Sequence, residues 1–237
     1  MKKSLIALAV LGLSGAAMAQ SSVTLYGVAD AGIGKIEAGS GLAAPLNDAS
    51  DKTEFISGSM MNNGTSRLGV RGVEDLGGGL KAGFQFETGL DLDNGGSSGA
   101  FWSRQANIWL GGNWGTVKLG RQFTPSYLTT STFELTVLGN TYNDAGIGLR
   151  ANSAFSYATP SFGGFTGALA YVTKTDLATP KAAYDLGLMY ANGPIGVGVS
   201  VNKFSTSKTN YQAGAKYSFG NFALAGSYTP DSNAAQA

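Results

Sequence analysis

The sequence predicts an all-β fold, a transmembrane antiparallel β-barrel, and three observations support this prediction. Apolar and polar residues alternate along most of the chain. Charged residues make up only 13% of it, and glycine accounts for 36 of the 237 residues. An average soluble domain carries about 25% charged residues. Alternation with a period of two is typical of strands with one apolar and one polar face.

The alternation is clearest in the segment 195–202, where odd-numbered residues are branched and apolar and even-numbered ones are small or polar. Many such segments approach the roughly 9–11 residues with which a tilted strand crosses a bilayer. No amphipathic helix is expected. About eleven strands are expected, at residues 22–36, 66–75, 80–91, 101–112, 115–122, 150–159, 164–173, 183–192, 195–203, 209–219 and 221–229.

The connections between these strands alternate in length. Short turns rich in Gly, Asn and Pro follow every second strand, whereas the other connections tend to be longer and include residues 37–65 and 123–149. One rim of the sheet should therefore carry short turns and the other rim long loops, as in outer-membrane barrels. Aromatic residues near the ends of apolar faces, such as Tyr184 and Tyr190, favour the same interpretation.

Residues 1–19 have the features of a cleaved signal peptide. Lys2 and Lys3 precede a short apolar core, and Ala17-Met18-Ala19 is a small-x-small cleavage site. The signal peptide predicts export, and together with the strand pattern it predicts localisation in the outer membrane. Without Lys2 and Lys3 the chain keeps 16 − 2 = 14 basic and 15 acidic residues, a net charge of −1. This near-neutral charge gives no indication of nucleic-acid binding.

The composition also argues against catalysis. The chain contains no cysteine and no histidine, so Ser-His and Cys-His nucleophilic sites and histidine-ligated zinc are excluded. No isolated carboxylate has a partner that would make an acid–base pair. The sequence therefore predicts a protein that is not an enzyme, with no metal and no cofactor.

The stretches SSVTLYGVADAGI, SRLGVRGVEDLGGGLKAGFQFETG, WSRQANIWLGGNWGTVKLGRQFTP and RANSAFSYATPSFGGFTGALAY resemble Gram-negative general porins of the beta-proteobacterial type. The resemblance covers most of residues 1–173 and is one of pattern beyond them. It implies a 16-stranded barrel in the lipid bilayer among lipopolysaccharide, usually a homotrimer, that passes ions and small hydrophilic solutes. The porin domain would span residues 20–237. Residues 123–149 would form an inward-folding constriction loop.

The resemblance also implies an arginine ladder opposite that loop, which maps onto Arg67, Arg121 and Arg150. Acidic groups of the loop would face the ladder, and the candidates are Glu134 and Asp144. Alternation places Arg67 and Arg150 on the polar face, because apolar residues occupy the opposite positions. By the same reasoning Arg71 faces the pore and is a fourth candidate for the constriction, and the other lumen-facing residues include Lys81, Gln85 and Glu87.

Two arginines break this alternation. Strict parity would put Arg121 on the lipid side, where a charge at the bilayer midplane costs about 2–4 kcal/mol. We expect a kink or bulge at Gly120 to turn Arg121 inward. Arg104 has the same parity problem, and its neighbours Phe101 and Trp102 suggest an interfacial anchor.

About eleven strands are fewer than the 16 implied by the resemblance, so a partial chain that lacks C-terminal strands is expected. Two other functions stay open from the sequence. One is a structural or adhesive outer-membrane barrel with a plugged lumen, and the other is a secreted, soluble β-sandwich that binds a partner. In a sandwich the apolar faces would be buried against each other.

Overall fold

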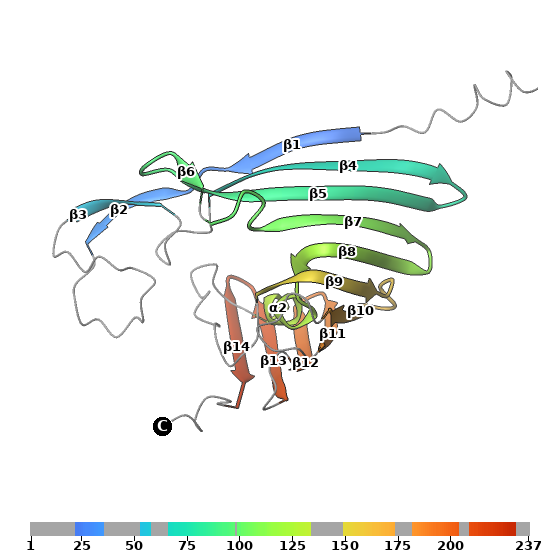
Figure 1. Cartoon of the computed structure of the whole chain (residues 1–237). Helices are drawn as coiled ribbons and strands as arrows, with labels where there is room; N and C mark the ends of the chain where they lie inside the picture. The colour runs from blue at the N-terminus through green and yellow to red at the C-terminus, as the bar shows by residue number, and fades with distance from the viewer. Residues whose placement is uncertain are drawn as a thin grey trace, which may run out of the picture.

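The computed structural model describes residues 22–35, 53–57, 66–97, 99–133, 149–173, 182–203 and 209–230. These residues form one large antiparallel sheet in the order β1-β4-β5-β7-β8-β9-β10-β11-β12-β13-β14 (Figure 1). Its strands are β1 (Ser22–Val28), β4 (Arg67–Gly77), β5 (Leu80–Asp91), β7 (Gln105–Gly112), β8 (Gly115–Phe123), β9 (Arg150–Ala158), β10 (Phe165–Val172), β11 (Ala183–Asn192), β12 (Ile195–Lys203), β13 (Asn210–Phe219) and β14 (Phe222–Tyr228).

Two of the predicted strands are wrong in their extent. The expected strand 22–36 is divided, because the main-chain N–H of Asp30 donates to Ser66 Oγ at 2.8 Å and pairing with β4 ends there. The chain then forms β2 (Ala31–Lys35), which pairs with β3 (Thr53–Ser57) in a separate small sheet. The short strand β6 (Gly96–Ser97) pairs only with β5.

The expected strand 101–112 begins only at Gln105. Residues 101–104 turn before it, and the main-chain N–H of Arg104 donates to the Glu87 carbonyl at 3.0 Å. The remaining predicted strands agree with the structure to within about two residues, which is the ordinary uncertainty of strand ends.

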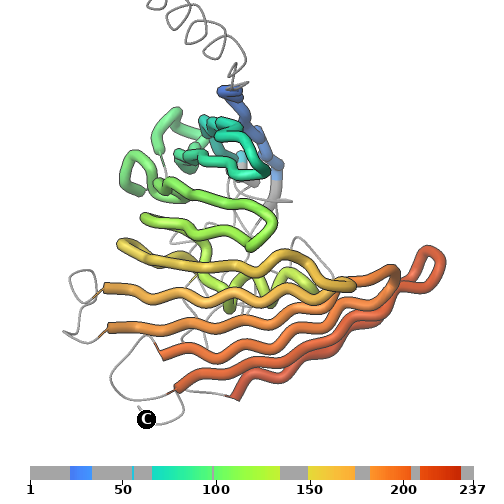
Figure 2. The backbone as a smooth tube through the Cα atoms, turned by 90° about the vertical axis from the view of Figure 1, so that its right-hand side faces the viewer, coloured from blue at the N-terminus to red at the C-terminus, as the bar shows by residue number. Residues whose placement is uncertain are grey.

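The large sheet is a single curved layer (Figure 2). One of its faces is apolar and the other is polar. On its convex face, Leu169 and Leu186 are each 49% exposed. On its concave face, Asp185 is 0% and Gln212 is 2% exposed. Soluble proteins bury apolar residues and expose charged ones, so this reversed arrangement suits a sheet whose convex face meets lipid. The soluble β-sandwich is therefore wrong, since the described strands form no second sheet packed against this face.

Aromatic side chains lie near both rims of the apolar face. Tyr171 and Tyr184 are opposite each other in register with ring centroids 5.3 Å apart. At the other rim, Phe165 and Tyr190 have ring centroids 4.5 Å apart. The rim that carries Phe165 is also the rim of the short turns, so the predicted difference between the two rims is confirmed.

The expectation that the chain holds no helix is wrong. Helix α2 (Pro125–Ser131) follows β8 and lies on the concave side of the sheet (Figure 2). The side-chain oxygen of Thr124 caps it by accepting from the Tyr127 N–H at 3.2 Å, and Pro125 occupies its first turn. Among the described residues, no helix combines the length and the apolar character needed to cross a membrane.

Candidate functional site

Helix α2 is fixed to the polar face of strands β11, β12 and β13, which together we call the docking wall. The carboxylate of Asp185 on β11 accepts from the Ser126 main-chain N–H at 3.1 Å and from the Ser126 hydroxyl at 2.6 Å. Asp185 and Ser126 are both 0% exposed. A buried carboxylate must have its oxygens hydrogen-bonded, and the first turn of α2 supplies these donors.

Two amide side chains hold the same turn of α2. Asn202 on β12 donates to Ser126 Oγ at 3.1 Å. Gln212 on β13 donates to the Ser126 carbonyl at 2.7 Å and to Thr130 Oγ1 at 2.8 Å. All these side chains are buried, so each bond protects a polar group that water does not reach. Side chains from three adjacent strands thus form hydrogen bonds with one face of the helix.

Glycines let α2 approach the docking wall closely. A Cβ atom on Gly198 would lie 2.6 Å from Thr129 Cγ2, and one on Gly196 would collide with the Thr132 carbonyl oxygen. Gly187 leaves space for α2 at Thr129, and Gly214 leaves space for Phe133 just after the helix. A larger residue at these positions would force the helix away from the sheet. The alternation in the segment 195–202 predicted that Gly196 and Gly198 lie on the polar face, but it indicated no role for them.

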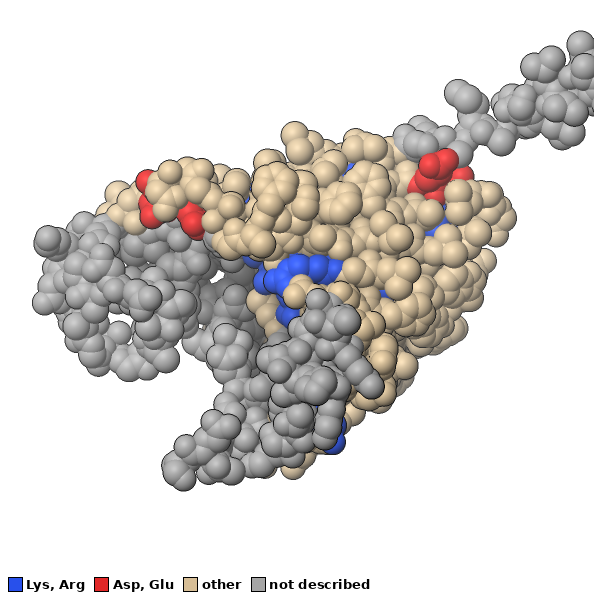
Figure 3. Space-filling model, in the orientation of Figure 1, with Lys and Arg blue, Asp and Glu red and all other residues tan. Residues whose placement is uncertain are grey.

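The strands β4 to β9 carry the predicted arginines, and we call this region the arginine wall. Arg71 and Gln85 are register partners on adjacent strands, and the Arg71 guanidinium lies 5.4 Å from the ring centroid of Tyr26. Arg67 lies four residues before Arg71 on the same strand and therefore shares its face. Figure 3 shows basic atoms in the central hollow, whereas the visible acidic atoms lie towards the two ends of the molecule.

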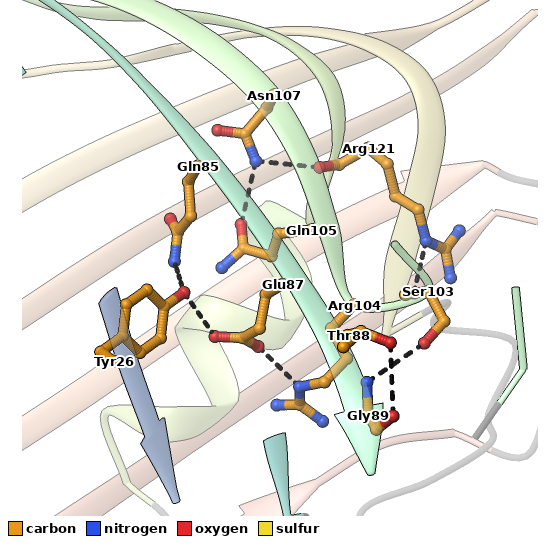
Figure 4. Close-up of polar contacts among 10 residues, drawn as sticks. All are labelled: Tyr26, Gln85, Glu87, Thr88, Gly89, Ser103, Arg104, Gln105, Asn107 and Arg121. Atoms are coloured by element: carbon orange, nitrogen blue, oxygen red, sulfur yellow. Dashed lines mark hydrogen bonds and ion pairs between the residues drawn. The ribbon is translucent and has the colours of Figure 1, made fainter. Parts of the chain in front are cut away.

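A polar network crosses the arginine wall (Figure 4). The Tyr26 hydroxyl donates to Glu87 Oε2 at 2.8 Å, and the Gln85 amide donates to the Tyr26 oxygen at 2.8 Å. Glu87 also forms an ion pair with Arg104, whose Nε lies 2.6 Å from Oε1. The Arg104 side chain is only 14% exposed. The prediction that Arg104 is an interfacial anchor is therefore wrong, since Arg104 neutralises a buried carboxylate on the polar face.

The bulge predicted at Gly120 is present. Gly120 pairs with Ala154 but Gln122 pairs with Ala151, so the register shifts between them, and Gly120 has a φ of 112°. This conformation favours glycine. β8 nevertheless keeps its register with β7 through Arg121, which is opposite Ala106, and the unmatched residues are on β9. The register therefore does not show the expected inward turn of Arg121.

Arg121 Nε donates to the Ser103 carbonyl at 2.6 Å, and its terminal nitrogen Nη1 donates to Asn152 Oδ1. Ser103 and Asn152 both lie near the end of β8 that leads into α2. The Arg121 side chain therefore points towards the rim of the sheet that carries the long loops. Asn152 and Ser153 are the residues of β9 skipped by the register shift.

The same shift breaks the alternation that predicted the orientation of Arg150. Its position nevertheless brings it to the arginine wall. The Arg150 guanidinium lies 4.6 Å from the ring centroid of Phe123 and within electrostatic range of Arg104 and Arg121. Lys81 lies on the same face as Gln85 and Glu87, near the short-turn rim. Glu134 and Asp144 lie outside the described residues, as does the predicted signal peptide.

A curved sheet with an apolar convex face, aromatic residues at both rims and a helix held on its polar concave face defines the class of outer-membrane β-barrel proteins. The Gram-negative porin family matches residues 4–237. The chain is 38% identical to outer membrane porin protein 32 of Delftia acidovorans, over 95% of this chain and 68% of that protein. It is 35% identical to an outer membrane porin protein of Bordetella pertussis, over 96% of this chain and 66% of that protein.

A solved structure gives the same result. The anion-selective porin from Comamonas acidovorans matches with a TM-score of 0.67 and 29% identity, over 87% of this chain and 67% of that one. This chain therefore belongs to the Gram-negative porin family, and its relatives are of the beta-proteobacterial type expected from the sequence. It is an outer-membrane porin and not an enzyme. The chain spans about two thirds of the length of these relatives.

Proposed function

We propose that the protein forms a water-filled channel for the passive diffusion of ions and small hydrophilic solutes, and that the segment 123–149 narrows it. The position of α2 carries this proposal. The helix begins this segment and lies on the polar concave face, with its first turn bonded to Asp185 and Gln212. A helix in this place takes up space that water and solutes would otherwise use, so the remaining path is narrower and lies next to the arginine wall.

We propose further that Arg67, Arg71, Arg121 and Arg150 border the narrowed path. Glu134 and Asp144 are the candidate acidic groups opposite them. Cations on one side and carboxylates on the other would create a transverse field in which polar solutes orient. Four arginines outnumber two carboxylates, and Glu87 is already paired with Arg104, so we propose a preference for anions. The similarity to a porin described as anion-selective supports this direction.

Membership of the porin family supports proposals for the partners of this protein. We propose that the convex face contacts the hydrocarbon core of the bilayer and that the long-loop rim meets lipopolysaccharide. We also propose that the protein assembles as a homotrimer, as the resemblance to general porins implies. Cross-linking of the protein in native outer membranes should then give a species of three chains.

The test is the conductance of the purified full-length protein in planar bilayers, with the reversal potential measured in a salt gradient. The expected result is stepwise conductance with an anion preference that Arg121→Glu weakens or reverses. Lys203→Glu is the matched control, because it makes the same charge change on an exposed residue at the end of β12. An unchanged preference in Arg121→Glu would refute the role of this arginine. A folded protein without conductance would favour a structural or adhesive barrel with a plugged lumen.

A further inference from the structure

A cavity of about 300 Å³ lies between α2 and the polar face of the sheet, near the start of the helix. Most of its wall comes from β8 to β10, and Gln105 of β7 and the first turn of α2 complete it. Its lining includes both polar and apolar side chains. The lining residues used below are Lys118, Gln105, Gln122, Pro125, Leu128 and Ala168.

Lys118 is the charged group of this cavity. It is opposite Trp109 and Ser156 in register and is partly buried. In the described part of the chain its ammonium group forms no ion pair and no hydrogen bond, and no carboxylate is among the residues that line the cavity. An ammonium that has lost part of its water without gaining a counter-charge is costly, so an anion in the cavity would offset that cost.

Gln105 provides a second donor. Its side chain is only 7% exposed, and its oxygen accepts from the Asn107 amide at 3.1 Å. Figure 4 shows its amide nitrogen pointing away from Asn107, and this nitrogen has no acceptor among the residues that the structure describes. Gln122 differs, because its oxygen accepts from Ser156 at 2.6 Å and its nitrogen donates to Ala154 at 3.2 Å. The cavity therefore has donors in excess, from Lys118 and Gln105.

We propose that this cavity binds a small monocarboxylate with a compact apolar body. The carboxylate would accept from Lys118 and Gln105, and the apolar body would lie against Pro125, Leu128 and Ala168. The volume is at the lower end of the range of about 300–1,000 Å³ for small-molecule sites, which suits a molecule of the size of benzoate. The assignment rests on the proposed channel, because the solute would reach the cavity from the lumen.

The test uses 4-fluorobenzoate as the probe. Its binding to the detergent-solubilised full-length protein is followed by fluorine NMR, which requires no ion flux. Lys118→Met should weaken binding by about tenfold or more, as expected for the loss of a charged hydrogen bond. Lys81→Met is the matched control, because it removes the same charge from the same face outside the cavity and should leave affinity unchanged. Lys118→Arg should retain most of the affinity.

The apolar half of the site has its own test. Leu128→Ser should weaken the binding of 4-fluorobenzoate but not of acetate, which competes with the probe through its carboxylate alone. Equal competition by chloride and by benzoate would overturn the carboxylate site in favour of a general anion site. Wild-type protein that conducts ions without binding the probe would overturn this site and leave the channel intact. Protein that binds the probe without conducting would refute the channel and retain the site.

Discussion

The arginine wall and the docking wall belong to the same sheet, yet their polar faces are built in opposite ways. The arginine wall carries long charged side chains, and its carboxylate Glu87 is paired with Arg104. The docking wall carries glycines, neutral amides and the carboxylate Asp185, which is bonded to a helix rather than to a cation. Long charged side chains need water around them, whereas small residues allow a helix to approach. The difference shows how one sheet can hold a helix against one part of its concave face and carry long charged side chains on the other.

The largest expected effect is the loss of the bond between Asp185 and α2. Asp185→Ala leaves the N–H and the hydroxyl of Ser126 without their buried acceptor, at about 1–3 kcal/mol for each group. The helix should leave the docking wall, and single-channel conductance should rise. Asp185→Asn retains an acceptor and should have a smaller effect. Asp75→Asn, at an exposed position near the end of β4, should change nothing. If Asp185→Ala conducts as wild type does, the position of α2 does not set the width of the channel.

A smaller effect is expected from filling the space between the helix and the sheet. In Gly196→Val the new side chain would collide with the main chain at Thr132, and overpacking of this kind costs about 1–3 kcal/mol. Conductance should again increase, together with faster proteolysis near α2. The matched control is Gly226→Val, because a Cβ on Gly226 meets no atom within 4 Å. Equal behaviour of the two variants would show that glycine is not required on the docking wall.

The smallest effect is expected on the arginine wall. Glu87→Gln keeps the shape of the side chain and an acceptor for Tyr26 but removes the charge that neutralises Arg104. One more net positive charge should then lie beside the lumen, so the anion preference should increase modestly, by about 1 kcal/mol or less, which is the interaction of two unit charges about 4 Å apart in water. Reversal potentials in a salt gradient measure this change. Glu74→Gln, near the rim with the short turns, is the control. A larger change of reversal potential in this variant would show that ion selectivity is not determined near Glu87.

Most strands could be predicted because each has lipid on one face and a polar interior on the other. Apolar and polar residues therefore alternate along the strand. The bulge at Gly120 was also predictable, because Arg121 conflicts with the alternation around it and glycine permits the change of register. Helix α2 left a weaker signal. Thr124 and Pro125 form a cap and a first turn, but seven residues are too few to show helical periodicity.

The sequence by itself determined the period of the strands, the polarity of each face, the short turns and the family. The tertiary structure alone decided that α2 lies against β11 to β13, that Arg104 pairs with Glu87, and that Lys118 borders a cavity. The physical reason is distance along the chain. Alternation and turn chemistry act between neighbours, whereas Ser126 and Asp185 are 59 positions apart and Ser126 and Gln212 are 86 apart. No local pattern shows which distant groups meet, because their contact depends on how the whole sheet curves.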